Sequence, residues 1–407
     1  MKYVGRIYKL CEISNPLKKY KEIFSKQVFQ SFVLMIQGFI LTSTIISCAS
    51  VSKKFVYSKS QQALNFFFNS AKFDLHSLVL NRLISCLNFA EHIYRKQDYI
   101  FFIVDDFVFS KRKYKKTEGV GVNYCGSSKK TLRSQCVVSS SCLIENYHFI
   151  FKSLFYIGKK YICRKQFQTK TQLAISLFSR FENFVKNHKS TVKMCIALLD
   201  GGYTNSYTIN AIKNSTVFKG FIGKFHYGRN IIVNNTNIKL KDYVAQLTLE
   251  NFIKLEVNGT QKYVHEVLCT ICKTCPIKMI LIIDNIHHPE ILSARPLITN
   301  ILELSAIEIA EFYAKRWKEE TYHQILKDAF FARTHKLRSL KALSRFMECI
   351  AVAYDVCEKR RLKNNQIGIF EVKNSLISIT NTNYILNIKG NKIKKLYWEK
   401  HIFRFAA

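Results

Sequence analysis

Two stretches of this chain are continuously hydrophobic, and each ends in acidic residues. Residues 99–104 (YIFFIV) are aromatic or β-branched and are followed by Asp105 and Asp106. Residues 194–199 (MCIALL) are followed by Asp200 and a Gly-Gly turn. An uninterrupted apolar run of this length predicts a strand that is buried on both faces of a sheet. We therefore expect two central strands that present carboxylates at their ends, unless these acids only cap the strands in solvent.

Before the first strand, hydrophobic positions recur with the period of a helix. We expect residues 1–92 to be helical throughout, with apolar patches in four segments: 20–42, 43–55, 60–68 and 74–89. Lysines lie in the connector that precedes the third segment. Short helices joined by a basic turn can place one helix in a DNA groove, and a plain helical bundle would show the same pattern.

A long helix is predicted over residues 305–327. Ser305 and Glu308 form a capping box, and neither Gly nor Pro occurs in the segment. Four functional side chains occur at helical spacing: Tyr313, Arg316, Glu320 and Lys327. At about 100° per residue they fall within about 60° of one another. This stripe is either a solvated charged face or a functional surface.

The remaining segments are β-rich or basic. Residues 216–284 show strand-like alternation, whereas the helical period resumes after residue 327 and lasts to about residue 361. The spacing of Cys269, Cys272 and Cys275 puts them on alternating faces of a strand, and a fourth ligand at suitable spacing is missing. The pattern therefore argues against a zinc or iron–sulfur site.

The net charge of the chain indicates which kind of partner it binds. The chain of 407 residues has 63 Lys and Arg against 28 Asp and Glu, a net charge of +35. Such an excess favours a polyanion, with nucleic acid first and a membrane surface second. The 13 cysteines follow no disulfide framework, and the N-terminus does not resemble a signal peptide, so we expect a cytoplasmic protein. Polar residues interrupt the apolar segment 28–49, so no membrane span is expected.

The spacing Y-x2-R-x3-E-x6-K in residues 313–327 resembles the signature of one large group of DDE transposases from bacterial insertion sequences. Two further blocks precede it in the family's order. The first begins at Asp105-Asp106, with Phe107 where Thr is common. The second is D-G-G-Y-T-N from Asp200, with Asn205 where an aromatic residue is usual. The resemblance covers about residues 25–355.

This resemblance implies a site and a fold. It implies that Asp106, Asp200 and Glu320 are catalytic and hold two Mg²⁺ or Mn²⁺ ions, and that Tyr313, Arg316 and Lys327 bind DNA. Asp105 would be the non-catalytic neighbour, because successive strand residues face opposite ways. Glu319 lies about 100° round the helix from Glu320 and is expected to tolerate Gln. The implied fold is α/β: a ribonuclease-H-like mixed sheet with flanking helices, a β-rich insertion and a helical N-terminal domain.

The expected organisation has five parts: a helical, DNA-binding domain (1–92), the first part of the catalytic domain (93–214), the β-rich insertion (215–300), the second part of the catalytic domain (301–360) and a basic tail (361–407). The function we expect is a DNA transposase that cuts and joins strands at the terminal inverted repeats of its element and at target DNA. It would act as a homodimer, associated with the bacterial nucleoid. The alternatives are a catalytically inactive DNA-binding relic and a structure-selective nuclease of the same fold.

Overall fold

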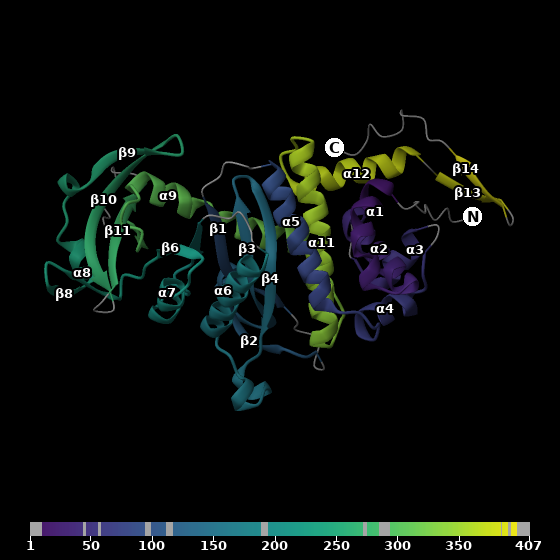
Figure 1. Cartoon of the computed structure of the whole chain (residues 1–407), viewed down its shortest axis with the longest axis horizontal. Helices are drawn as coiled ribbons and strands as arrows, with labels where there is room; N and C mark the ends of the chain where they lie inside the picture. Colours follow the sequence, from purple (N-terminus) through teal and green to yellow (C-terminus); the bar gives the residue numbers. More distant parts are fainter. Residues whose placement is uncertain are drawn as a thin grey trace. The chain divides into compact units, whose positions relative to one another are not determined.

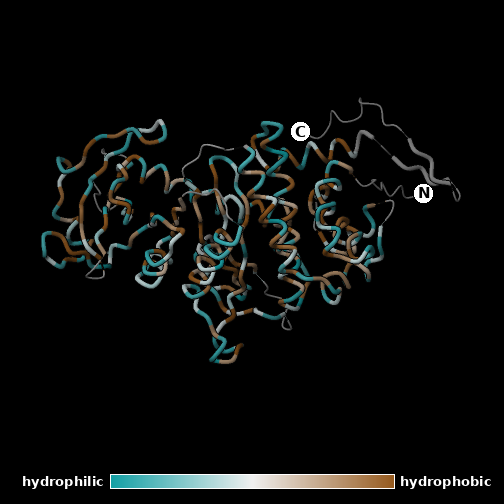
Figure 2. The backbone as a smooth tube through the Cα atoms, in the orientation of Figure 1, coloured by the Kyte–Doolittle hydropathy of each residue, from teal (hydrophilic) through white to brown (hydrophobic). Residues whose placement is uncertain are grey.

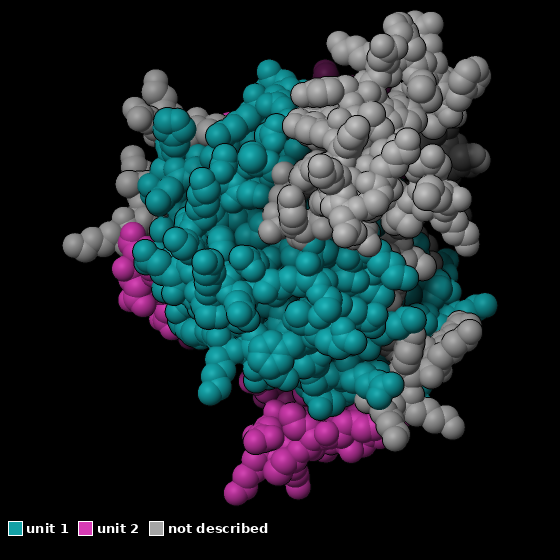
Figure 3. Space-filling view, turned by 90° about the vertical axis from the view of Figure 1, so that its right-hand side faces the viewer, with its two compact units in different colours: residues 1–93, 108–136, 322–407 teal, residues 94–107, 137–321 magenta. Residues whose placement is uncertain are grey.

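The computed structural model describes residues 10–43, 46–55, 58–93, 99–110, 117–188, 194–271, 275–284, 294–383, 385–389 and 392–396. They form a mixed α/β protein with a mixed sheet, which is consistent with the predicted ribonuclease-H-like fold with flanking helices (Figure 1). The chain divides into two compact units (Figure 3). Unit 1 comprises residues 1–93, 108–136 and 322–407, and unit 2 comprises residues 94–107 and 137–321.

The central sheet of unit 2 has the strand order β4–β3–β1–β5–β6. The strands are β1 (Ile100–Ser110), β3 (Lys130–Ile144), β4 (Tyr147–Tyr156), β5 (Cys195–Leu199) and β6 (Phe218–Lys224). Strand β5 is parallel to both β1 and β6. Both predicted apolar strands therefore exist and lie side by side.

Both faces of this sheet are covered, which explains why the two strands are continuously apolar. On one face, Phe102 contacts Phe181 of α6 (Lys170–Asn187), with ring centroids 4.4 Å apart. On the other face, Phe101 contacts Phe312 of α9 (Ala306–Ala314), with centroids 5.0 Å apart. Helix α7 (Ser206–Lys213) follows β5, and the Asn205 side chain caps its start by accepting a hydrogen bond from the Thr208 N–H.

The β-rich region extends the same sheet instead of forming a separate one. Strand β12 (Arg295–Thr299) pairs antiparallel with β6, and β11 (Cys275–Ile283) and β10 (Thr260–Ile271) follow in turn. The smaller elements are β7 (Asn230–Val233), β8 (Thr236–Lys239), α8 (Leu240–Ala245) and β9 (Ile253–Val257). Cys269 and Cys275 lie on the paired strands β10 and β11, whereas Cys272 lies outside the described residues.

The predicted long helix over residues 305–327 is interrupted, so this prediction was wrong in one respect. Its capping box forms as expected, but α9 ends at Ala314 and α10 runs from Trp317 to Asp328. Between them the Arg316 N–H donates to the Tyr313 carbonyl oxygen at 3.0 Å, and the Glu319 N–H donates to the Arg316 carbonyl oxygen at 3.0 Å. These bonds join residues three apart, so the turn is tighter than that of an α-helix. The residues of α10 therefore do not continue the stripe that an uninterrupted helix would form.

Unit 1 is mainly helical and confirms the helical N-terminus. Its helices are α1 (Cys11–Leu17), α2 (Lys26–Leu41), α3 (Cys48–Lys54), α4 (Gln61–Asn69), α5 (Leu75–Ile93), α11 (Leu340–Lys363) and α12 (Ile369–Asn383). Strand β2 (Val120–Cys125) pairs with the first part of β3, and β13 (Ile385–Lys389) pairs with β14 (Lys392–Leu396). Hydrophobic and hydrophilic positions alternate along the helices (Figure 2). No helix among the described residues has the length and apolarity needed to cross a bilayer.

Buried cations join the N-terminal helices to α11 and α12. Arg345 of α11 donates to the carbonyl oxygens of Phe67 and Phe68 at the end of α4. Lys373 of α12 donates to the Phe39 carbonyl oxygen at the end of α2 at 2.8 Å. The last carbonyls of a helix lack partners within it, so these contacts satisfy groups that would otherwise be buried without a donor. The N-terminal helices thus belong to one unit with the C-terminal ones.

Candidate active site

The register of the central strands brings two of the predicted acids together. Strands β1 and β5 pair in parallel with Val104 opposite Leu199, so the next residues, Asp105 and Asp200, lie level with each other. Paired residues on neighbouring strands point to the same face of a sheet. Asp200 ends its strand as predicted, whereas β1 continues past the two aspartates to Ser110, so the expected strand end at Asp106 was wrong.

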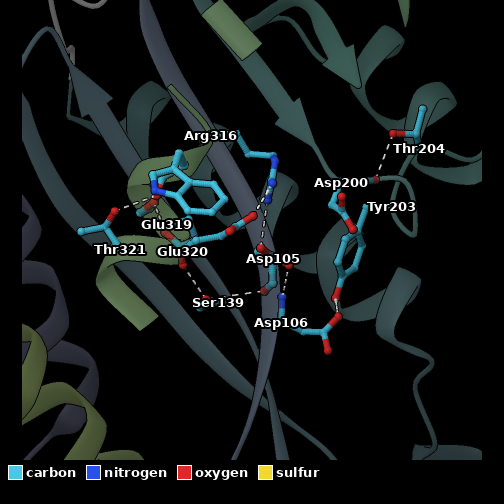
Figure 4. Close-up of polar contacts among 12 residues, drawn as sticks. Asp105, Asp106, Ser139, Asp200, Tyr203, Thr204, Arg316, Glu319, Glu320 and Thr321 are labelled. Atoms are coloured by element: carbon cyan, nitrogen blue, oxygen red, sulfur yellow. Dashed lines mark hydrogen bonds and ion pairs between the residues drawn. The ribbon is translucent and has the colours of Figure 1, made fainter. Parts of the chain in front are cut away.

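The two faces of β1 separate Asp105 from Asp106. Asp105 lies on the face that α9 covers, together with Phe101 and Ile103. Asp106 points to the opposite face, where it accepts hydrogen bonds from Lys170 Nζ at 2.7 Å and from the Tyr203 hydroxyl at 2.9 Å (Figure 4). The predicted alternation is therefore present, but it is Asp105 that faces the helix carrying the glutamate.

Arg316 lies between Asp105 and Glu320 (Figure 4). Its Nη1 is 3.1 Å from Asp105 Oδ2, and its Nη2 donates to Glu320 Oε1. The exposed fractions of the three side chains are 12% for Arg316, 17% for Asp105 and 33% for Glu320, so solvent still reaches the cluster. Burial alone would lower the pKa of Arg316, but its interactions with Tyr313, Asp105 and Glu320 raise that pKa above its ordinary value.

Tyr313 borders the same cluster from α9. Its ring lies 5.6 Å from the Arg316 guanidinium carbon. Burial raises the pKa of its hydroxyl to about 12, so Tyr313 stays a neutral hydrogen-bond donor at physiological pH. A cavity of about 490 Å³ adjoins the cluster, and it is lined by acidic, basic and aromatic side chains that include Asp200, Lys224, Lys262, Arg295, Tyr313 and Trp317.

Glu319 has a different environment from its neighbour Glu320. It is completely buried, accepts hydrogen bonds from Ser139 at 2.5 Å and from Ser141, and lies 3.6 Å from His148 Nε2. A buried carboxylate that accepts two hydrogen bonds anchors the start of α10 to β3. The expectation that Glu319 tolerates Gln rested only on its angle of about 100° from Glu320 on an ideal helix, and the burial and hydrogen bonds of Glu319 argue against it.

A comparison with protein families identifies a relationship for part of the chain. Residues 20–152 match the family described as DDE superfamily endonuclease. The match supports a DDE-superfamily, transposase-like protein. It covers β1 with both of its aspartates and ends before Asp200 and Glu320. No curated protein matches the chain. The family implies an endonuclease-type enzyme that acts on DNA, and DDE nucleases generally use divalent metal ions.

The side chains present fit a divalent cation by their chemistry. Asp105, Asp200 and Glu320 offer hard carboxylate oxygens, which Mg²⁺ and Mn²⁺ prefer. Asp105 and Glu320 also contact one and the same cationic group, the Arg316 guanidinium. Within the described part of the chain, no three His, Cys, Asp or Glu side chains are close enough to form a ready-made metal site. A metal bound by these acids would therefore replace Arg316 as the neutralising charge.

The structure brings together most, but not all, of the predicted site residues. Asp200, Tyr313, Arg316 and Glu320 meet in unit 2, whereas Lys327 lies seven residues beyond Glu320 on α10, in the part assigned to unit 1. Sequence reasoning missed the burial of Glu319 and its serine partners. The signal available was the triplet of serines at 139–141, between the apolar residues 136–138 and 142–144.

Proposed function

We propose that this chain is a DNA transposase that cleaves and joins strands at the ends of its element, with Asp105, Asp200 and Glu320 as its catalytic carboxylates. One observation carries the proposal: Asp105 and Asp200 lie level on adjacent parallel strands, and Glu320 shares the Arg316 guanidinium with Asp105. In this assignment Asp105 takes the role that the family resemblance implied for Asp106.

The residues around the carboxylates would bind and orient the scissile phosphate. Two Mg²⁺ or Mn²⁺ ions, when bound, would activate the attacking hydroxyl and stabilise the leaving oxygen. Arg316 presents a planar fork of donors that matches two phosphate oxygens, and Tyr313 adds a neutral hydroxyl donor. Lys224, Lys262 and Arg295 around the cavity provide further cations for the DNA backbone.

Arg316 would have two states in this scheme. Without DNA and metal it neutralises Asp105 and Glu320, which prevents repulsion between two acids near one another. When metal ions neutralise these acids, the guanidinium becomes available for a phosphate group. Lys327, further along α10, would contact the backbone of the same DNA end, and the pairing of two ends would require at least a dimer.

The decisive experiment is a matched pair of substitutions at neighbouring positions. Asp105→Asn and Asp106→Asn each remove one charge without changing side-chain size. Cleavage and strand joining would be measured with Mn²⁺ on DNA that carries the terminal inverted repeats flanking the gene. We expect Asp105→Asn to abolish both reactions and Asp106→Asn to retain a measurable fraction. The reverse ranking would return the catalytic role to Asp106.

The same assay separates the two alternatives. A structure-selective nuclease would cleave branched DNA and never join strands to a target. A catalytically inactive relic would bind the repeats without cleaving them. Joining of a 3′-hydroxyl end to target DNA is the result that only the transposase gives, and its absence in a preparation that cleaves would overturn the proposal.

A further inference from the structure

A second group of cations lies wholly within unit 1, around a cavity of about 390 Å³. Its lining includes Lys19 from the 3₁₀ helix η1 (Lys18–Ile23), Lys359, Arg360 and Lys363 from α11, and the ring of Phe89 from α5. These residues are far apart in the sequence. None of them belongs to the segments that form the carboxylate site.

Two of the ammonium groups converge on a single serine. Lys19 Nζ donates to Ser85 Oγ, and Lys359 Nζ donates to the same oxygen at 3.0 Å and to the Ser85 carbonyl oxygen at 2.9 Å. The centroid of the Phe89 ring is 5.4 Å from Lys359 Nζ and 6.0 Å from Lys363 Nζ. Three positive charges are thus held close together by neutral acceptors.

Two carboxylates near the lysines are engaged elsewhere, whereas the exposed Glu12 also lines the cavity. Asp355 borders the cavity but pairs with Arg82 at 3.3 Å, and Glu358 pairs with Arg361 at 2.7 Å. Among the residues that the structure describes, Lys19, Lys359 and Lys363 form no ion pair. Burial of the ammonium group, together with the charge of Lys359, lowers the pKa of Lys19 to about 8. The three lysines thus lie close together without an ion-pair partner among the described residues.

The helix dipole alone does not account for this arrangement. Cations in the last turn of α11 are favourable because the helix C-terminus carries partial negative charge. However, the Lys359 ammonium group turns to Ser85 on α5, and Lys19 comes from a different segment of the chain. An oxyanion in the cavity would accept hydrogen bonds from several of these ammonium groups at once. The volume lies in the range of small-ligand sites, about 300–1,000 Å³.

We propose that Lys19, Lys359 and Lys363 form a phosphate-binding site in the helical unit. The phosphate group comes either from the backbone of a nucleic acid or from a free phosphate compound. This inference does not depend on the carboxylate site, so a failure of either proposal leaves the other one standing.

The first test measures inorganic phosphate binding to the full-length chain by titration calorimetry, at constant ionic strength against chloride. The site variant is Lys19→Gln/Lys359→Gln. The control is Lys18→Gln/Lys21→Gln, which removes two exposed lysines from the same 3₁₀ helix. We expect the site variant to lose at least tenfold in phosphate affinity and the control to change less than twofold. Equal affinities in both variants would overturn the proposal.

The second test identifies the source of the phosphate. Affinity for a duplex without element ends is measured as a function of salt in the same three proteins. If the site holds a nucleic-acid backbone, the slope of log K against log salt falls by up to about two for the site variant relative to the control. If only inorganic phosphate binding is lost, the source is a free phosphate compound. If neither measurement distinguishes the variants, there is no such site.

A third variant guards against a folding defect. Lys359 also donates to a backbone carbonyl, so its loss could weaken the helical unit itself. Lys363→Gln removes a charge that forms no hydrogen bond within the described residues. We expect a threefold to tenfold loss of phosphate affinity with an unchanged melting temperature. A Lys363→Gln protein that binds phosphate like the control would contradict the assignment.

Discussion

Two arginines of this chain each lie between two carboxylates, and the two clusters differ in their exposure to solvent. In unit 1, Arg82 pairs with Glu348 at 2.5 Å and with Asp355 at 3.3 Å, and the exposed fractions are 1%, 8% and 5%. In unit 2, Arg316 pairs with Asp105 and Glu320, with exposed fractions of 12%, 17% and 33%. The chemical groups are the same. The second cluster is the more exposed of the two, and Arg316 itself lines a cavity, whereas only Asp355 of the first cluster borders one.

The difference separates a structural ion network from a reactive one. A network without solvent cannot exchange its arginine for another cation, and each of its charges depends on the others. The Arg82 network also includes Cys86, whose thiol lies 3.1 Å from Asp355 Oδ2, and the Arg82 side chain is only 1% exposed. In the proposed function, the more exposed Arg316 cluster would give up its carboxylates to a metal ion. Substitutions in the two clusters should therefore fail in different ways.

The largest expected effect is on catalysis. Glu320→Gln removes the charge that we propose holds a metal ion while keeping the side chain's shape, so cleavage and strand joining should fall by at least about 1,000-fold, or roughly 4 kcal/mol in the activation barrier. Its unfolding free energy should stay within about 0.5 kcal/mol of the parent protein. Single-turnover DNA cleavage and urea unfolding measure the two quantities. Glu311→Gln on α9 is the control; a Glu320→Gln protein with full activity would remove Glu320 from the site.

In unit 1, a substitution in the Arg82 network is expected to lower the free energy of unfolding. Arg82→Met leaves Glu348 and Asp355 buried without their partner, which should lower the unfolding free energy by about 3–5 kcal/mol. The triple variant Arg82→Met, Glu348→Leu, Asp355→Leu removes all the charges and should recover much of this stability. Urea unfolding of both variants checks the prediction. If the triple variant is less stable than the single one, the network contributes more than mutual neutralisation.

A smaller loss is expected at Glu319, next to the catalytic position. Gln cannot accept in the same way from Ser139 and Ser141 and removes the charge near His148, so we expect a loss of about 1–3 kcal/mol in unfolding free energy. Activity per folded molecule should change far less than in Glu320→Gln. The two glutamates thus provide an internal comparison, measured by the same cleavage and unfolding assays. Unchanged stability in Glu319→Gln would mean that its hydrogen bonds contribute little.

The smallest expected effect is on DNA binding by Lys327, which follows Glu320 on α10. Lys327→Ala should weaken binding to the element end by about tenfold or less and reduce the salt slope by about one, as expected for one lost phosphate contact. Lys318→Ala is the control, because this exposed lysine lies on the other side of the helix from Glu320. Binding measured at several salt concentrations distinguishes them. Equal effects of the two variants would indicate general attraction to positive charge.

Local sequence patterns predicted the elements of the fold well. These elements include the two apolar strands, the N-terminal helices and the capping box at Ser305, which depend on residues close together in the chain. The continuation of β1 past the aspartates also had a local signal. Phe107 and Phe109 maintain the alternation and are both buried, so the strand need not end at Asp106.

The orientation of the site depended on contacts between distant residues. Which aspartate faces the glutamate is decided by α9 and α6 covering different faces of β1, and nothing in residues 99–106 specifies that choice. The burial of Glu319 depends on Ser139 and Ser141, which are 180 and 178 positions away.

The division of the chain into two units limits how the protein could be cut or recombined. The chain passes between the units at residues 93/94, 107/108, 136/137 and 321/322. The second and third passages fall inside strands β1 and β3, and the last falls inside α10, one residue after Glu320. No single backbone cut releases either unit as one continuous segment. Truncation from either end should therefore remove part of a shared strand or helix, and exchange between related genes should preserve function only when it replaces nearly the whole coding sequence.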